Sequence, residues 1–437
     1  MPTSTTAESD NARDDDDDAS LASRFGPGLI TGAADDDPSG IATYSQAGAQ
    51  FRFALVWTLF LTTPLMIGIQ MLSARVGFVT RNGLSTNIGR ICPRWLTVSL
   101  IGLLVVANTI NIAADVAAMA EAVKLLVGGP PPIYVLAIGA VCIAMQVFFS
   151  YERTVRVLKW LTLALFAYVA VVLVVGVPWR RALVESMQPW AFLPTDTTAK
   201  EYAAMVVAVL GTTISPYLFF WQATQEVEDC RRRPEGKSLR NHPAYVRKHL
   251  RRIRIDTVVG MGFSNLVALC IVVATAVTLN QRGIVNIQKS AQAAEALRPV
   301  AGEFAFLIFA LGIVGTGLLA VPVLAGSAAY AVSELFGWKA GLSRGFHEAR
   351  GFYLIIIAAT GIGSAMGAFD VDPIKALVLS AIINGVISVP VMVVLMLIGQ
   401  SPQLMGRFTI TPRHRFFGWS ATAVMAVAVL VMFATSL

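Results

Sequence analysis

The chain has 437 residues, of which 55% are hydrophobic and only 14% are charged. A soluble domain carries about 25% charged residues, so this composition excludes an ordinary soluble protein and indicates a polytopic membrane protein. The formal net charge of +7 would suggest nucleic-acid binding in a soluble chain. Here the basic residues lie in short segments between apolar runs, as membrane topology requires, so no nucleic-acid partner is predicted.

The chain begins with a polar, acidic tail, and its cysteines are scattered. Residues 1–24 include aspartates at 14–18 and lack the basic start and apolar core of a signal peptide, so we expect a disordered tail. The remaining residues, 25–437, are predicted to form one transmembrane domain. Cys92, Cys142, Cys230 and Cys270 have neither zinc-ligand nor disulfide-framework spacing.

Apolar runs long enough to cross a bilayer follow one another along this domain. Each spans roughly 20 residues or more, which predicts an all-α membrane protein with eleven transmembrane helices. The longest run is treated as one tilted span, because splitting it would disturb the charge pattern described next. The predicted spans are 26–49, 53–74, 97–126, 131–150, 157–177, 201–226, 255–279, 303–336, 351–368, 374–398 and 416–436.

Basic residues are distributed unevenly between the loops that join these spans. With the N-terminus inside, the inside segments carry far more arginine and lysine than the outside ones, as the positive-inside rule requires. We therefore expect a multi-pass protein of the plasma membrane with a cytoplasmic N-terminus and a C-terminus outside. The most basic inside segment, 231–254, is explained by contact with anionic lipid of the bilayer.

The first span is interrupted by the stretch "GAADDDPSGIA" at residues 32–42. Pro38 lacks an N–H group and disfavours helical geometry at the residue before it. Asp35, Asp36 and Asp37 are costly at the middle of a membrane unless they face a polar cavity. The sequence therefore predicts a helix that is broken in two near the midplane.

The sixth span carries a second interruption, "GTTISPYLFFWQA" at 211–223. Proline kinks are common in membrane helices, but two at matching positions, one with three aspartates, favour an ion site. Interrupted spans one and six are typical of two inverted five-helix repeats whose freed carbonyls and half-helix ends coordinate ions. The repeats are placed at about 25–178 and 198–400, with an extra helix at about 413–437.

Four segments resemble one known family. They are "GPGLITGAADDDPSGIATYSQAGAQF", "NIAADVAAMAEAV", "GTTISPYLFFWQA" and "GLLAVPVLAGSAAYAVSELFGW", which look like its first, third, sixth and eighth helices. From residue 25 onward the chain is similar to the NRAMP-type divalent metal transporters, and most to their magnesium-transporting relatives. The resemblance implies a LeuT-like fold and a divalent metal ion as the transported substrate. We expect no resident cofactor, and no obligate protein partner is evident from the sequence.

The first-helix motif of that family, Asp-Pro-Gly-Asn, is only partly present. Asp37 and Pro38 match it, whereas Ser39 replaces glycine and Gly40 replaces the metal-binding asparagine. Ala34 holds the position that offers a backbone carbonyl to the metal.

The sixth-helix motif, Met-Pro-His, is also altered. Ser215 replaces methionine, Pro216 matches and Tyr217 replaces histidine, while Thr212 holds the second carbonyl position. Asp35 and Asp36 stand where the family usually has uncharged residues. The metal-site residues that the resemblance implies are Asp37, Ser215, Ala34, Thr212, Gly40, Tyr217, Asp36 and Asp35.

These replacements change the expected ion. A methionine thioether is a soft ligand that favours transition metals, and its loss removes that preference. An acidic site of oxygen ligands with extra space suits Mg²⁺, which gives up its water reluctantly. Mn²⁺ also accepts oxygen ligands and is the second candidate. The alternative is a proton-coupled Mn²⁺/Fe²⁺ importer of the NRAMP type.

The acidic and histidine residues that carry protons in the family are mostly replaced. Asp115 matches one acid of the third helix, but Asn108 and Ala118 stand where others are expected. Tyr217 and Gln222 take two histidine positions, and a phenol does not titrate near neutral pH. The sequence therefore predicts weak or absent proton coupling, with Asp115 as either a residual proton path or a structural hydrogen-bond acceptor.

Other polar residues are expected to line the path, and no catalytic motif is present. Gln222 and Gln225 are predicted to face the cavity, and Asn384 lies on a polar stripe that either lines the path or bonds to a neighbouring helix. The four histidines are expected in inside loops, and the chain is not predicted to be an enzyme. A carrier of organic solutes is disfavoured because the aspartates would repel an anionic group, and a sensor because no sizeable soluble domain is predicted.

Overall fold

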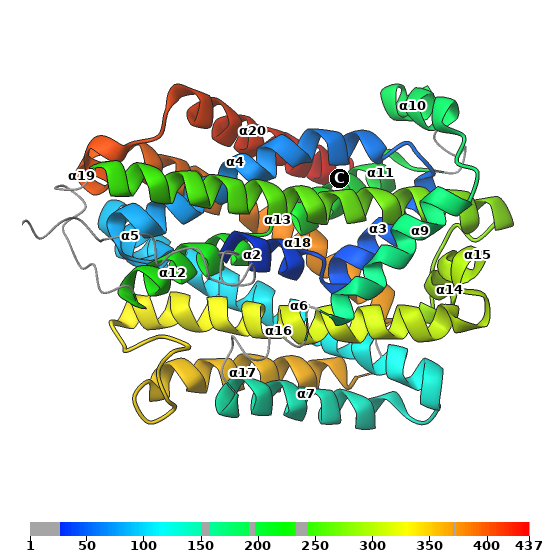
Figure 1. Cartoon of the computed structure of the whole chain (residues 1–437), viewed down its shortest axis with the longest axis horizontal. Coiled ribbons are helices and arrows are strands. Elements are labelled where there is room, and N and C mark those ends of the chain that lie inside the picture. Colours follow the sequence, from blue (N-terminus) through cyan, green and yellow to red (C-terminus); the bar gives the residue numbers. More distant parts are fainter. Residues whose placement is uncertain are drawn as a thin grey trace, which may run out of the picture.

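The computed structural model describes residues 27–149, 158, 160–191, 197–232, 243–369 and 372–436. Within these ranges the chain is helical and contains no strand. Long helices lie side by side in one bundle (Figure 1). The predicted disordered tail, residues 1–24, lies outside the described residues.

Nine helical stretches of the described chain are long and apolar enough to cross a membrane, and they coincide with nine of the predicted spans. The predicted single span at 303–336 is confirmed, because it forms one helix that contains Pro322. The helices are α4 (Val56–Thr80), α6 (Arg94–Val127), α7 (Pro131–Phe148), α11 (Ala199–Thr213) with α12 (Pro216–Arg232), α13 (Pro243–Thr278), α16 (Ala305–Phe336), α17 (Arg350–Gly367), α18 (Pro373–Gln400) and α20 (Pro412–Ala434).

The first and fifth predicted spans are built from shorter pieces. The first consists of α2 (Pro27–Asp35) and α3 (Pro38–Phe51). The fifth contains η1 (Leu161–Leu165) and α9 (Phe166–Val174), which are bent by 106° from α10 (Trp179–Met187). Gly176 and Pro178 lie at this bend, where a flexible residue and a missing N–H group end the helix.

Both predicted helix breaks are present. In the first span, α2 ends at Asp35 and α3 begins at Pro38, with Asp37 extended at φ −70° and ψ 171° as the N-cap. A proline fits the first helical position and pushes the preceding residue into extended geometry. In the sixth span, α11 ends at Thr213 and α12 begins at Pro216 for the same reason.

The broken helices lie at the centre of the bundle, where every residue of α3 except Gln50 is buried. Close packing is possible because small residues face neighbouring backbones. A Cβ atom at Gly32 would lie 2.4 Å from the carbonyl oxygen of Gly260 on α13, and one at Gly211 would lie 2.1 Å from that of Ala381 on α18. Both breaks are therefore surrounded by protein.

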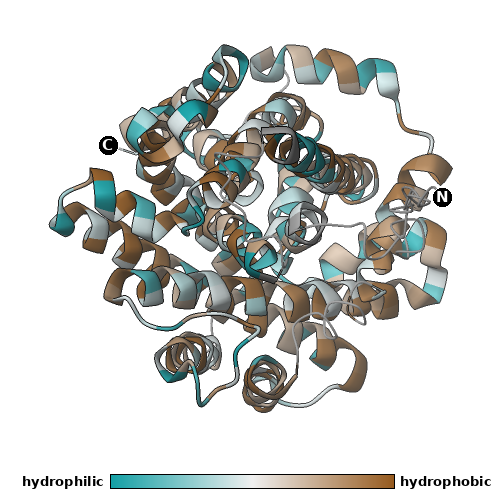
Figure 2. Ribbon diagram, turned by 60° about the vertical axis from the view of Figure 1, so that its left-hand side comes forward, coloured by the Kyte–Doolittle hydropathy of each residue, from teal (hydrophilic) through white to brown (hydrophobic). Residues whose placement is uncertain are grey.

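The periphery is apolar, as expected for a surface in contact with lipid. On α7, large hydrophobic residues such as Ile133, Leu136 and Phe148 are exposed. Figure 2 shows mostly hydrophobic ribbon on the outer helices at the bottom of the view.

Two sequence expectations are wrong, namely that residues 243–254 form a loop and that the histidines lie in loops. Residues 243–254, predicted as part of a basic inside loop, form the first turns of α13. Lysine and arginine are good helix formers, so α13 extends beyond its apolar part. Consequently His249 lies in a helix, as does His414 at the start of α20, whereas His347 lies in a turn. His242 lies outside the described residues.

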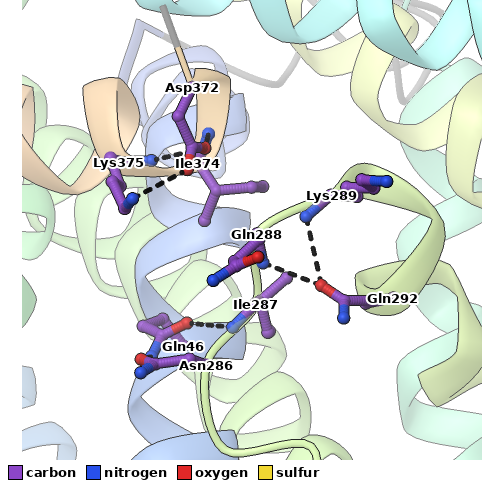
Figure 3. Close-up of polar contacts among 9 residues, drawn as sticks. All are labelled: Gln46, Asn286, Ile287, Gln288, Lys289, Gln292, Asp372, Ile374 and Lys375. Atoms are coloured by element: carbon purple, nitrogen blue, oxygen red, sulfur yellow. Dashed lines mark hydrogen bonds and ion pairs between the residues drawn. The ribbon is translucent and has the colours of Figure 1, made fainter.

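The connection between α13 and α16 folds against α3. It contains the short helices α14 (Ser290–Ala294) and α15 (Arg298–Ala301). Gln46 of α3 accepts a hydrogen bond from the backbone N–H of Ile287 at 2.9 Å (Figure 3), and its amide nitrogen lies 3.2 Å from the carbonyl oxygen of Val285. Gln46 therefore anchors this connection to the first broken helix.

Candidate functional site

The carboxylate of Asp37 joins the two broken helices. Asp37 is only 2% exposed, and its Oδ1 accepts a 2.7 Å hydrogen bond from the backbone N–H of Gly40, which caps α3. Its Oδ2 lies 3.2 Å from the amide nitrogen of Asn111 on α6 and 3.2 Å from the hydroxyl of Tyr217 on α12. The partial positive charge of the α3 N-terminus favours an anionic group here.

Tyr217 brings the predicted metal-site residues of both breaks together. Its hydroxyl, besides contacting Asp37, lies 3.4 Å from the carbonyl oxygen of Ala34 at the end of α2. At the start of α3, a Cβ atom at Gly40 would lie 3.2 Å from Oγ1 of Thr212. Asp37, Ala34, Tyr217, Gly40 and Thr212 thus lie around the two interruptions, and that they bind a metal ion stays a prediction.

Ser215 lies in the break itself and is turned toward the end of α11. Its hydroxyl lies 2.8 Å from the carbonyl oxygen of Gly211 and 2.9 Å from that of Thr212, which are left without helical partners where α11 ends. Ser388 of α18 likewise donates to the carbonyl of Ile214 at 2.5 Å. Buried backbone groups need such partners, so these serines stabilise the break.

Asp35 and Asp36 face a different helix from Asp37. The hydroxyl of Ser264 on α13 lies 2.7 Å from Oδ2 of Asp35 and 3.0 Å from Oδ1 of Asp36. Both aspartates are buried, and Oδ1 of Asp35 has no hydrogen-bond partner among the described residues. The structure therefore separates the three aspartates into a pair toward α13 and a single carboxylate toward α6 and α12.

Asp115 faces the same break as Asp37. It lies one helix turn after Asn111 on α6, is 0% exposed, and its carboxylate lies near that of Asp37 and near the backbone N–H of Ser39. Neither carboxylate oxygen has a hydrogen-bond partner of normal geometry within the described chain. Asn108, two turns before Asp115, instead donates to the carbonyl of Leu324 and to Ser327 on α16.

A chain of amide side chains continues from the break along α12. Gln222 accepts a 2.5 Å hydrogen bond from Gln70 of α4 and donates to Thr257 of α13 at 3.0 Å. Gln225 lies nearly one turn further on and is partly buried, and Asn384 is buried on α18. That Gln222, Gln225 and Asn384 line the permeation path stays a prediction.

Sequence analysis missed three partners of the aspartates and amides, namely Asn111, Ser264 and Gln70. Each is a polar residue in an otherwise apolar span, which is the signal that could have identified it. Asn111 also has the helical spacing that places it on one face with Asp115.

The chain is similar to known proteins over nearly its whole length. The family model described as "Natural resistance-associated macrophage protein-like", Nramp, matches residues 28–435. The divalent metal cation transporter MntH of Caldanaerobacter subterraneus subsp. tengcongensis is 23% identical over 433 residues, which cover 94% of this chain and 93% of that protein. MntH of Acidiphilium cryptum is 26% identical over 425 residues, which cover 93% of this chain and 88% of that protein.

Solved structures share the fold at lower sequence identity. A manganese transporter of Eremococcus coleocola aligns with a TM-score of 0.70 and 16% identity, over 94% of this chain and 86% of that one. Mhp1, a nucleobase-cation-symport-1 family transporter, aligns with a TM-score of 0.53 and 13% identity, over 94% and 93% of the two chains. The predicted all-α fold with broken helices 1 and 6 is confirmed.

Proposed function

The chain belongs to the Natural resistance-associated macrophage protein-like (Nramp) family, and from that premise we propose that it carries hard divalent metal cations across the membrane. It acts as a secondary transporter or facilitated carrier by alternating access. Mg²⁺ is the preferred ion and Mn²⁺ the second candidate. The relatives are named as transporters of divalent metal cations or of manganese, and we propose neither an enzymatic activity nor a resident cofactor for this chain.

One observation carries the proposal: a buried carboxylate, Asp37, lies where two interrupted helices meet. Burying an anion away from water costs several kcal/mol unless an opposite charge compensates it. Among the described residues the contacts of Asp37 are neutral donors, namely Gly40, Asn111 and Tyr217. A divalent cation supplies the missing positive charge.

The groups around Asp37 suit a hard cation. They include the carboxylate of Asp37, the carbonyl oxygen of Ala34 and the hydroxyl of Tyr217. We propose that the oxygens of Thr212 and Ser215, at the facing break, join them when the ion binds. Magnesium and manganese accept such ligands, and magnesium retains several waters as well. The hydroxyl of Tyr217 can rotate so that its oxygen faces the ion.

Asn111 and Asp115 complete this arrangement from α6. The amide oxygen of Asn111 has no hydrogen-bond partner among the described residues, so a rotated amide can offer that oxygen to the ion. Asp115 supplies a second carboxylate, and two carboxylates balance the charge of one divalent cation.

We further propose weak or absent proton coupling. A proton path through a membrane protein needs a series of titratable groups. In the first turns of α12 after the break, the polar chain consists of Gln70, Gln222 and Thr257, which do not titrate. The next acidic side chain, Glu226, lies about one turn beyond Gln222. Asp115 is the acidic group of α6 beside Asp37, and we assign it to charge balance at the ion.

For orientation, we propose a plasma-membrane protein with a cytoplasmic N-terminus and a C-terminus outside. The basic segments that were predicted inside and lie in the described residues include α5 (Leu84–Ile91), the start of α13, the turn after α16, and the start of α20. These elements gather at the left end of the bundle in Figure 1, whereas α10, α14 and α15 lie at the right end. The arrangement supports the positive-inside assignment.

Uptake into proteoliposomes tests this function, with a Mg²⁺ dye and a pH dye read together. We expect Mg²⁺ uptake without acidification of the lumen, abolished by Asp37→Ala and retained in Asp372→Ala, whose carboxylate caps the start of α18 near the surface. Folding of each variant is checked by its size-exclusion profile. Mn²⁺ uptake with acidification, and no Mg²⁺ uptake, would overturn the proposal in favour of the proton-coupled importer.

A further inference from the structure

We propose that the chain holds a transition-metal cation at a second site, between α12 and α13, and that this ion restrains the two helices. The site consists of Glu226 and Asp229 of α12 and His249 of α13, hereafter the α12–α13 cluster. It lies well away from Asp37 along α12, because Glu226 follows Tyr217 by nine residues, a rise of roughly 14 Å.

The three side chains converge from two helices. One ligand atom from each lies within 4.8 Å of the others, and Nε2 of His249 lies 3.2 Å from Oε2 of Glu226. Glu226 and Asp229 are three residues apart, so they share a face of α12. Metal–ligand bonds of about 2.0–2.2 Å place the ligand atoms of one ion roughly 3–4 Å apart, so small side-chain shifts complete the site.

Two further observations point to a ligand. Glu226 is 0% exposed, and its second oxygen, Oε1, has no hydrogen-bond partner among the described residues. A buried carboxylate oxygen without a partner is costly, and a metal ion satisfies it. The imidazole of His249 stacks on Phe78 of α4 with 4.0 Å between ring centres and 13° between ring planes, which holds the ring in a fixed orientation.

The cluster is buried on one side and open on the other. His249 is 3% exposed, whereas the side chain of Asp229 is 28% exposed and gives an ion access. Arg252 of α13 lies 2.7 Å from Oδ2 of Asp229 and competes with the ion for this carboxylate. Removing the arginine charge is therefore expected to strengthen metal binding.

The ligands of the α12–α13 cluster favour a different class of ion from the one proposed at Asp37. One imidazole and two carboxylates suit borderline metals such as Zn²⁺, Co²⁺, Ni²⁺ and Fe²⁺, whereas Mg²⁺ prefers oxygen ligands alone. A carrier of hard cations would thus bind transition metals at a place where they do not compete for the Asp37 site.

The position of α13 gives this site a consequence for transport, which rests on the proposed function. Asp256 of α13 accepts a 2.7 Å hydrogen bond from the backbone N–H of Gly28 on α2, and Ser264 of α13 contacts Asp35 and Asp36. An ion that ties α12 to α13 therefore ties together halves of both broken helices. We expect a bound transition metal to slow Mg²⁺ transport.

Binding is tested with Co²⁺ on purified, metal-free protein carrying Asp37→Ala, which removes the central carboxylate. Calorimetry and visible absorption report binding, because a nitrogen ligand and low coordination number intensify the Co²⁺ bands. We expect one Co²⁺ per chain, at least tenfold weaker in His249→Gln, tighter in Arg252→Gln, and unchanged in His414→Gln. His249→Gln keeps a hydrogen-bond donor for Glu226, so the helices can still pack.

Two results would overturn the site: Co²⁺ binding that is equally strong in His249→Gln, or binding that disappears with Asp37→Ala alone. The transport consequence is tested in proteoliposomes, where Co²⁺ should inhibit Mg²⁺ uptake more strongly in the wild type than in His249→Gln. Equal inhibition would refute the restraint. Absence of Mg²⁺ uptake from all variants would refute the proposed function, whereas the Co²⁺ titration still decides the second site.

Discussion

Replacing Asp115 with asparagine is expected to weaken ion binding and, at the same time, to stabilise the ion-free protein. The Asp115 carboxylate is buried close to that of Asp37 on the facing break. Two neighbouring carboxylates repel each other in the absence of a cation, and together they attract a divalent cation. The substitution keeps the shape of the side chain and removes one charge.

The expected magnitudes follow from this charge. At an effective dielectric constant of about 20, two unit charges about 4 Å apart interact by about 4 kcal/mol. A divalent cation at twice that distance interacts equally strongly with one carboxylate, because its doubled charge offsets the longer separation. Asp115→Asn should therefore raise the Kd for Mg²⁺ by about a thousandfold. Relief of the repulsion should raise the free energy of unfolding by about 1–4 kcal/mol.

Calorimetric Mg²⁺ titration and thermal unfolding without Mg²⁺ measure the two effects on detergent-purified protein. Asp372→Asn is the matched control, because that carboxylate caps α18 and lies far along the chain from either break. An unchanged Kd together with a lower melting temperature would refute the reasoning. It would show that Asp115 serves as a structural hydrogen-bond acceptor.

Three further substitutions test the packing and the chemistry of the site. Gly211→Ala should lower the free energy of unfolding by about 1–3 kcal/mol, because the added Cβ would lie 2.1 Å from the Ala381 carbonyl oxygen. Thermal melts measure this loss, with Gly262→Ala as the control because nothing lies within 4 Å of a Cβ there. Ser215→Met should shift competitive uptake from Mg²⁺ toward Mn²⁺ because it adds a soft ligand, and an unchanged ratio would count against Ser215 as an ion contact. Gln46→Ala should speed proteolysis of the connection after α13, which loses its hydrogen bonds to α3; equal cleavage rates would argue against that anchor.

Features that depend on neighbouring residues in the chain were predictable. Both helix breaks were predicted where they occur, because Pro38 and Pro216 each remove a backbone donor and exclude helical geometry just before them. The apolar spans were predicted for a similar reason, since about 20 consecutive apolar residues already specify a membrane-crossing helix. The start of α13 was not predictable in this way. Its basic residues were interpreted as a loop, but from residue 243 onward they are helical.

The partners of the candidate site residues come from distant parts of the chain. The sequence placed Asp35, Asp36 and Asp37 together, but the helix break turns the first two toward Ser264 and the third toward Asn111 and Tyr217. The rotation of each half-helix about its axis decides this separation, and packing against α6, α12 and α13 sets that rotation.

The sequence by itself thus determined the class of the fold, the two interruptions and the acidic, oxygen-rich character of the first one. All three follow from composition and from short-range backbone geometry, which need no knowledge of neighbouring helices. The tertiary structure alone decided which carboxylates share a site and brought His249 to Glu226 and Asp229. These contacts join different helices, and they depend on helix packing at ångström scale, which residue type and spacing do not specify.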